Sequence, residues 1–287
     1  MQLNMNIENN ESRFKQVIND FGKLYNQEII YKYTGFNTAL EHIITNNTLQ
    51  FSNPKDFNDP FDCHEGLINV AKFSDDDFLK IMDDSEIVTN HMNSNSLPID
   101  FYEKNREELL KRIRDKKEIQ GLWKKKHSHY RVTCFSAIPD NPLMWAHYAE
   151  KHSGISLGFK FPLFPDSFRV YPVNYYDVIN PIEARTAVTK VIHYWLTSKS
   201  HHWAYENEFR AVTMNDTEII KFPQEWLTEI IFGCRVSEKN IEKIVRLVRN
   251  KLKYKTIKIK KVKINPETFS LKLITLYDIQ NHKNKLK

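Results

Sequence analysis

Glycine is scarce in this chain, with 7 residues in 287. Neither GxGxxG nor GxxxxGK followed by Ser or Thr occurs. These are the loops that bring backbone amides close to phosphates in dinucleotide-binding and P-loop folds. The sequence therefore argues against a nucleotide site of either kind.

Cysteine is scarcer still, and its three residues, Cys63, Cys134 and Cys234, form no CxxC pair. This usage is typical of a protein in a reducing compartment. The first residues carry no cationic start followed by an apolar run, so we expect no signal peptide. No apolar stretch approaches the roughly 20 residues of a membrane span. We predict a soluble, cytoplasmic globular protein without membrane contact.

Metal-binding patterns are also missing. The chain has 11 histidines, but no HExxH and no Cys/His pairs at finger spacing. Cys134 lies within a predicted strand, where a small buried thiol is common, and Ser136 has no GxSxG around it. We expect no metal site and no hydrolase triad.

Positive charge is abundant in two tracts. Lys and Arg number 42 against 36 Asp and Glu, a net charge of +6. Residues 244–263 carry nine cations and no acid, and residues 111–127 are also rich in Lys and Arg. Such tracts can bind the phosphates of DNA or RNA. A solvated helix face followed by a lysine-protected edge strand is the simpler alternative.

The hydrophobic pattern mixes helices and strands without regular βα alternation, which favours an α+β fold with mainly antiparallel sheets and flanking helices. We expect a single domain over 1–287, with its core at about 28–280 and a helical insertion at about 74–129. The expected strands are 27–33, 49–54, 130–136, 153–161, 167–178, 202–213, 225–233, 255–263 and 268–277. The expected helices outside the insertion are 11–26, 38–47, 141–152, 181–200 and 237–252.

One predicted strand has an unusual polar face. In WAYENEFRAV, residues 203–212, alternate side chains share a face, so Glu206, Glu208 and Arg210 would project together. The plain interpretation is a solvated face with a cross-strand ion pair of little energetic value. The functional interpretation is a pair of carboxylates in a site.

Two further segments carry candidate site residues. FNDPFD, residues 57–62, is a turn that its two phenylalanines can anchor, and it is either a rigid loop or a loop presenting Asn58 or Asp59 to a ligand. In the helix of 141–154, Met144, Trp145 and Tyr148 fit a core better than a site. His147 can still point into a pocket beside Ser136.

The order of six short motifs resembles a bacterial family of domains of unknown function. The motifs are YKY, LQFSNPKDFNDPFDC, CFS, LMWAHYAEKHSGISLGF, YENEFR and IIFG. That family has the FNDPFD loop, a CFS strand, an MWxHYAxxHxG helix and a WxYExEYR strand. The resemblance covers about residues 29 to 235. The family usually reads YKYR, whereas Thr34 follows Tyr33 here, which leaves the role of a first-strand arginine unfilled.

More distantly, the chain resembles DarT-like ADP-ribosyltransferases. These carry a polar or basic residue on the first strand, a serine-bearing strand, and a late strand with Glu or Gln-x-Glu. The resemblance implies an ADP-ribosyltransferase-like core that uses NAD as a substrate, in a bacterial toxin or phage-defence effector with a possible antitoxin or defence-system partner. The matching positions are Tyr31, Lys32, Tyr33, Ser136, Glu206 and Glu208.

The chemistry gives the two carboxylates distinct roles. Breaking the nicotinamide–ribose bond develops positive charge on the sugar, which a carboxylate stabilises. We assign this role to Glu208 and acceptor activation to Glu206, with Arg210 against a dinucleotide phosphate. The alternative is a non-enzymatic nucleic-acid-binding or sensor module that uses the basic tracts. A nuclease is a third idea, although no compact set of metal-binding carboxylates stands out.

Overall fold

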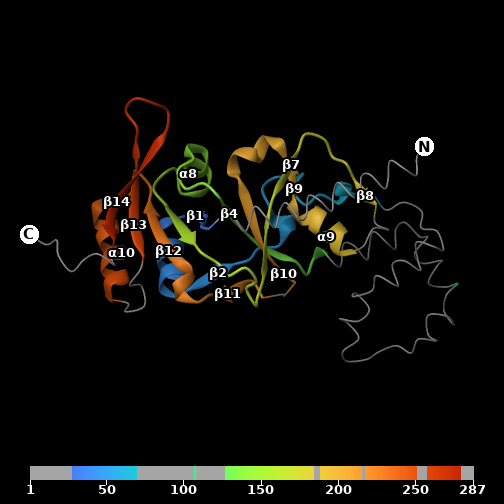
Figure 1. The fold of residues 1–287 in the computed structure, drawn as a ribbon, viewed down its shortest axis with the longest axis horizontal. Helices are drawn as coiled ribbons and strands as arrows, with labels where there is room; N and C mark the ends of the chain where they lie inside the picture. The colour runs from blue at the N-terminus through green and yellow to red at the C-terminus, as the bar shows by residue number, and fades with distance from the viewer. Residues whose placement is uncertain are drawn as a thin grey trace, which may run out of the picture. The chain divides into compact units, whose positions relative to one another are not determined.

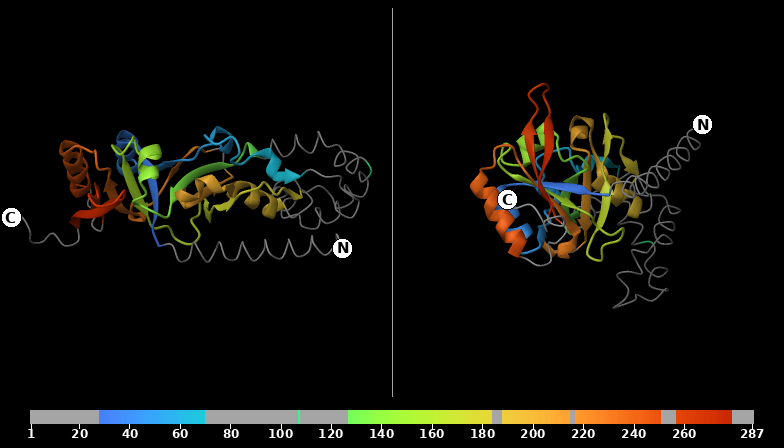
Figure 2. Two further views of the ribbon diagram at one scale, coloured as in Figure 1. Left: turned by 90° about the horizontal axis from the view of Figure 1, so that it is seen from above. Right: turned by 60° about the vertical axis from the view of Figure 1, so that its left-hand side comes forward.

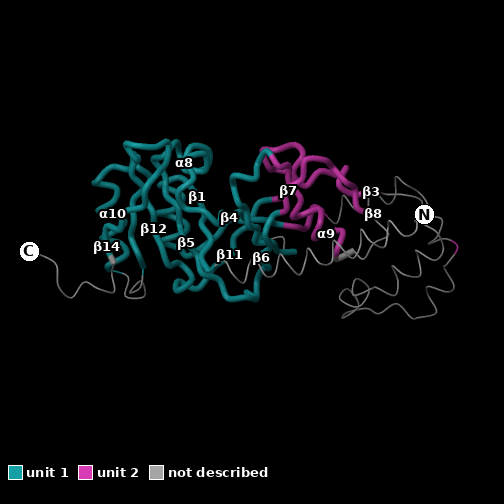
Figure 3. The backbone as a smooth tube through the Cα atoms, turned by 45° about the horizontal axis from the view of Figure 1, so that its top comes forward, with its two compact units in different colours: residues 1–52, 131–173, 202–287 teal, residues 53–130, 174–201 magenta. Residues whose placement is uncertain are grey.

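The structure is a computed structural model that describes residues 28–69, 107, 127–183, 188–214, 217–250 and 257–278. The chain divides into two compact units (Figure 3). The first is drawn from residues 1–52, 131–173 and 202–287, and the second from residues 53–130 and 174–201. The sequence had suggested one domain with an insertion at about 74–129, and most of that insertion lies outside the described residues.

An eight-stranded sheet forms the centre of the first unit, in the order β14-β13-β12-β5-β1-β4-β10-β6 (Figure 1). Every pairing in it is antiparallel except that of β12 with β13. Its strands are β1 (Ile30–Thr34), β4 (Arg131–Ser136), β5 (Ile155–Phe159), β6 (Arg169–Pro172), β10 (Glu208–Thr213), β12 (Leu227–Phe232), β13 (Lys258–Ile264) and β14 (Leu271–Asp278). The predicted α+β class with a mainly antiparallel sheet is confirmed.

One face of this sheet is apolar and carries two helical segments. Ile30 of β1, Leu157 of β5 and Ile230 of β12 lie on this face, and each is 3% exposed or less. The π-helical turn η1 (Ala39–Thr45), which continues α2 (Phe36–Thr38), packs there with α10 (Glu238–Asn250). The amphipathic pattern of α10 accounts for this position, because Ile, Val and Leu recur along one stripe of the helix.

The opposite face is smaller and more polar. Its apolar cluster contains Tyr31, Tyr33 and Ile231 from the sheet and Met144 and Trp145 from α8 (Pro142–Tyr148). Asn141 caps this helix by accepting a hydrogen bond from the amide of Leu143, as the sequence pattern Asn-Pro favours. The prediction that Met144 and Trp145 belong to a core is confirmed.

The predicted strand of 202–213 is wrong in its first half. Residues His201–Glu206 form the 3₁₀ turn η4, and β10 begins only at Glu208. Between them, Asn207 has a positive φ of 43°, a backbone conformation that ends regular pairing. Glu206 and Glu208 therefore do not follow one another along a continuous strand.

The first unit also contains β2 (Thr48–Gln50), which pairs with β11 (Ile219–Lys221), and the turn η5 (Gln224–Trp226). The β13–β14 hairpin projects from this unit in Figures 1 and 2, and Phe269 near its tip is fully exposed. β13 is an interior strand with β14 outside it, so the prediction of an edge strand at 255–263 is wrong.

The second unit contains two short parallel pairs and a helix. β3 (Ile68–Asn69) pairs with β8 (Ile182–Glu183), and β7 (Asn174–Tyr176) pairs with β9 (Ser198–Ser200). On α9 (Val188–Thr197), the Trp195 indole donates a hydrogen bond to the carbonyl of Cys63, 2.6 Å away, and stacks on His127. This unit also holds the turns η2 (Pro54–Asp56) and η3 (Glu65–Leu67).

The predicted helix of 11–26 lies outside the described residues. Within the described part of the chain, no helix is both long and apolar enough to cross a membrane.

The apolar face provides a stability test. Ile230 is completely buried, so Ile230→Ala should lower the free energy of unfolding by about 2–5 kcal/mol through lost burial and the cavity that remains. Ile264→Ala, at a position that is 72% exposed, should change it by no more than about 0.5 kcal/mol. Urea unfolding of the two variants measures the difference, and equal losses would contradict the assignment of this face.

Candidate functional site

Five residues lie side by side across five neighbouring strands on the polar face. Glu229 pairs with Gly158, Gly158 with Tyr31, Tyr31 with Ser136, and Ser136 with Glu208. Residues opposite each other in antiparallel pairs share a face. We call this set the polar row. It joins segments that are separated by up to 198 positions in the sequence.

Ser136 lies near the middle of the polar row at the end of β4. Its hydroxyl donates to the carbonyl of Glu206 at 2.6 Å and accepts from the amide of Ile138 at 3.1 Å. It is completely buried. Ser136 therefore holds the chain at the junction of η4 and β10, directly before Glu208.

Glu208 and Arg210 form a two-point ion pair on β10. Arg210 donates from Nε to Oε1 at 2.8 Å and from Nη2 to Oε2 at 3.1 Å. Glu208 is 3% exposed and Arg210 is completely buried. Because a buried lone charge is costly, each side chain is present in the interior largely on account of the other. The plain interpretation of a solvated strand face is wrong.

Glu206 is also buried, at 3% exposed, and has a different partner. The Tyr148 hydroxyl of α8 donates to its Oε1 at 2.6 Å, and the Asn141 side chain donates to the carbonyl of Tyr205 at 2.9 Å. These two contacts join α8 to η4. Tyr148, interpreted from the sequence as a core residue, supplies a polar group to the site.

The other end of the polar row is a second charged cluster. The Tyr31 hydroxyl donates to Glu229 Oε2 at 3.3 Å, and Lys260 donates to Oε1 at 2.7 Å. Gly158 makes room for this arrangement, because a Cβ there would lie 2.9 Å from the Cβ of Glu229 and 3.1 Å from Cε1 of Tyr31. Burial and the neighbouring carboxylate of Glu229 both raise the pKa of Tyr31.

Tyr33 and Lys32 complete the YKY motif on β1. The Tyr33 ring packs edge-on against Trp145, its hydroxyl donates to the carbonyl of Ile138 at 2.7 Å, and burial raises its pKa. The Lys32 side chain instead reaches β4, where it donates to the Thr133 hydroxyl at 2.7 Å. Burial lowers the pKa of Lys32, against the opposing effects of Cys134 and Glu208. Alternation therefore separates Lys32 from the two tyrosines.

Three further predicted site residues lie away from the polar row and from the side chains bonded to it. His147 is exposed on α8, and its ring lies 6.4 Å from that of Tyr205. Asn58 and Asp59 belong to the second unit, where Asn58 is exposed and Asp59 accepts from the amide of Phe61 at 2.9 Å. Phe61 is 61% exposed, so the prediction that it anchors this loop in a core is wrong.

Sequence reasoning missed Glu229 and Gly158. The signal for Glu229 was available, since it is the lone charged residue in the strand LTEIIF, and a carboxylate there needs a buried partner. Gly158 in ISLGF was also a signal, because glycine inside a strand often marks close approach of a neighbour.

The basic tract of 244–263 does not form one charged surface. In its described part, Lys260 pairs with Glu229, Lys261 pairs with Glu238, and Arg249 lies over the ring of Tyr277. Apart from its last residue, the tract of 111–127 lies outside the described residues. Among described side chains, no group of three or more His, Cys, Asp or Glu is placed to hold a metal ion.

These features define a mixed α+β protein whose mainly antiparallel sheet carries on one face a buried row of carboxylates and hydroxyls, with Arg210 and Lys260 paired to its carboxylates. A family model described as "Protein of unknown function (DUF2971)" matches residues 144–211. This span includes most of α8 together with Glu206 and Glu208, and it supports the resemblance to a family of domains of unknown function. No curated protein and no solved structure matches the chain.

The contribution of the Glu208–Arg210 pair to stability can be tested by removing first one charge and then both. Arg210→Met should cost about 3–5 kcal/mol of unfolding free energy, because it removes the counter-charge and two hydrogen bonds of a buried carboxylate. Adding Glu208→Leu to that variant should recover much of the loss, since no lone charge remains. Denaturant unfolding of the two variants measures the recovery. A double variant less stable than Arg210→Met would contradict this account.

Lys32 should give stability a defined pH dependence. A lowered pKa means that the folded state holds fewer protons than the unfolded chain between the folded pKa and about 10.4, so stability rises with pH there. Wild type should therefore gain stability relative to Lys32→Met as the pH is raised through that window. Urea unfolding at a series of pH values measures the gain, and a constant difference would disprove it.

Proposed function

We propose that the protein cleaves the nicotinamide–ribose bond of NAD and transfers ADP-ribose to an acceptor. The observation that carries the proposal is the adjacency of β1, β4 and β10. β1 carries YKY, β4 carries CFS, and β10 begins with the last three residues of YENEFR. Tyr31, Ser136 and Glu208 lie opposite one another on one face. The three motifs therefore lie on neighbouring strands in the same order as in the sequence, as a site formed by all three requires.

The reaction assigns complementary roles to the two glutamates. Nicotinamide leaves C1′ of the ribose with the electron pair of the broken bond, and the Glu208 carboxylate stabilises the positive charge that develops on the sugar. A nucleophile of the acceptor bonds to C1′ as nicotinamide departs, and its proton passes to Glu206 in the same transition state. Tyr148 orients Glu206 through its 2.6 Å hydrogen bond.

The site is closed in this conformation, since Ser136, Glu206 and Glu208 are each 3% exposed or less. Substrate entry therefore requires α8 and η4 to separate at the contacts of Tyr148 with Glu206 and of Asn141 with Tyr205. Arg210 would then exchange part of its pairing with Glu208 for a phosphate of NAD. These two hydrogen bonds contribute about 0.5–3 kcal/mol each to the cost of such opening.

The acceptor in this proposal is nucleic acid, protein or water. A toxin or phage-defence role would follow from modification of a host or phage macromolecule, with an antitoxin or defence-system partner restraining it.

The proposal is tested by incubating the purified protein with NAD and measuring free nicotinamide, with and without nucleic acid or cell lysate. Glu208→Gln and Glu206→Gln should each reduce release at least about 100-fold, because each removes a carboxylate used in the transition state. Glu225→Gln, at an exposed position in η5, is the matched control and should retain full activity.

Thermal unfolding of each variant separates lost chemistry from lost fold. Absence of nicotinamide release by folded wild-type protein under every condition rejects NAD cleavage. Release that is unchanged in folded Glu208→Gln and Glu206→Gln rejects these residues as the catalytic pair and leaves the reaction in place.

A further inference from the structure

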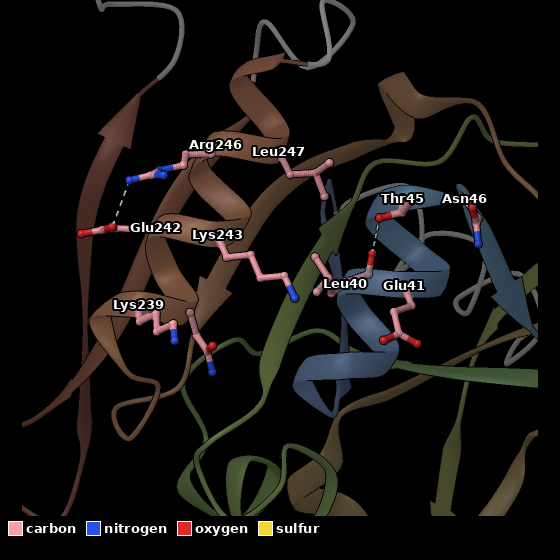
Figure 4. A pocket seen from close by; sticks show the side chains of 10 residues that line it. Leu40, Glu41, Thr45, Asn46, Lys239, Glu242, Lys243, Arg246 and Leu247 are labelled. Atoms are coloured by element: carbon pink, nitrogen blue, oxygen red, sulfur yellow. Dashed lines mark hydrogen bonds and ion pairs between the residues drawn. The ribbon is translucent and has the colours of Figure 1, made fainter.

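An open groove of about 1030 Å³ lies between η1 and α10 in the first unit (Figure 4). One wall comes from η1, with Leu40 and Glu41, and the other from α10. Both helical segments pack on the apolar face of the sheet, whereas the polar row lies on the other face. The groove is therefore a surface separate from the candidate catalytic site.

Three cations of α10 line this groove, namely Lys239, Lys243 and Arg246. They stand at i, i+4 and i+7, which places them on one side of the helix over about 10 Å. In Figure 4, Lys243 extends from α10 toward η1. The sequence tract of 244–263 contained only Arg246 of these three, so the folded helix gathers a different set of charges.

Two of these cations form no hydrogen bond or ion pair that would stabilise the described part of the fold. The ammonium groups of Lys239 and Lys243 make no hydrogen bond or ion pair with any described residue, and both side chains are exposed. Arg246 has a 3.5 Å contact with Glu242, and both side chains are more than 65% exposed. A surface pair of this kind is weak and exchanges readily for another anion.

The spacing and the walls of the groove fit one strand of nucleic acid. Cations that recur about once per helical turn, 5.4 Å apart, can meet successive phosphates of a single backbone. Leu247 lines the groove as a partly buried apolar side chain, and the unpaired bases of a single strand can pack against it, whereas Leu40 belongs to the core behind the groove. Glu41 is the opposing charge on the η1 wall.

We propose that the groove between η1 and α10 binds single-stranded nucleic acid through its phosphates, with Lys239, Lys243 and Arg246 as the contacts. This site does not depend on NAD cleavage. Because it lies across the sheet from Glu206 and Glu208, it holds a strand at a distance from those carboxylates and is a docking surface.

The test is binding of fluorescent 12-nucleotide single strands, in an RNA arm and a DNA arm, to the full chain between 50 and 200 mM salt. Three phosphate contacts predict a slope of log K against log salt of about −2, an affinity loss of roughly twentyfold over this range. The triple variant Lys239→Glu, Lys243→Glu, Arg246→Glu should abolish binding at 50 mM salt.

Two matched variants make the test specific. Lys221→Glu, Lys263→Glu, Lys272→Glu changes the net charge equally at exposed positions outside the groove and should keep at least half of the affinity. Glu41→Gln should bind several-fold more tightly, because it removes the opposing charge. Circular dichroism checks that each variant is folded.

Each possible result of this binding experiment supports or overturns a stated part of the proposal. Binding by the groove variant at the wild-type level, or equal losses in the groove and control variants, overturns the site. A duplex that binds as tightly as the single strands overturns the single-strand assignment. A difference between the RNA and DNA arms identifies which nucleic acid the groove prefers, and these results stand whether or not nicotinamide is released.

Discussion

The pairing of Tyr31 with Ser136 is the constraint on which the site depends. β1 and β4 are joined in register at this one position, and β4 in turn carries β10 along its whole length. Because side chains alternate along a strand, a shift of one residue here would move Tyr31 and Tyr33 to the apolar face and bring Lys32 into the polar row. The register therefore decides which members of the YKY motif can meet Ser136 and Glu208.

The polar row and its neighbours contain several buried charges, each with a bonded partner. Glu208 is paired with Arg210, Glu229 is paired with Lys260, and Glu206 accepts from Tyr148. Removing one side chain of such a contact takes a hydrogen bond from a buried polar group in a region of low dielectric, which costs more than the contact itself contributes. Such a face adds little to net stability.

Much of this arrangement follows from local sequence patterns. Strands β1, β4, β5 and β12 coincide with runs of β-branched and aromatic residues, and α10 follows a clear helical periodicity. The break at Asn207 was not foreseeable, because aromatic residues at Trp203 and Tyr205 suit a strand as well as a 3₁₀ turn. Glu229 reaches the polar row because β12 pairs with β5, and the strand propensities of single residues do not predict which strands pair.

The Glu208–Arg210 pair spans only two positions of the chain, which affects how the interior is assembled. Contacts between distant segments require loop closure, and its entropic cost must be met before the contact contributes. A pair on one strand avoids this cost, since extending the segment is enough to bring the guanidinium beside the carboxylate. The charges of Glu208 and Arg210 can thus be paired before β10 joins the sheet, and this strand can lose its water before the surrounding segments have folded.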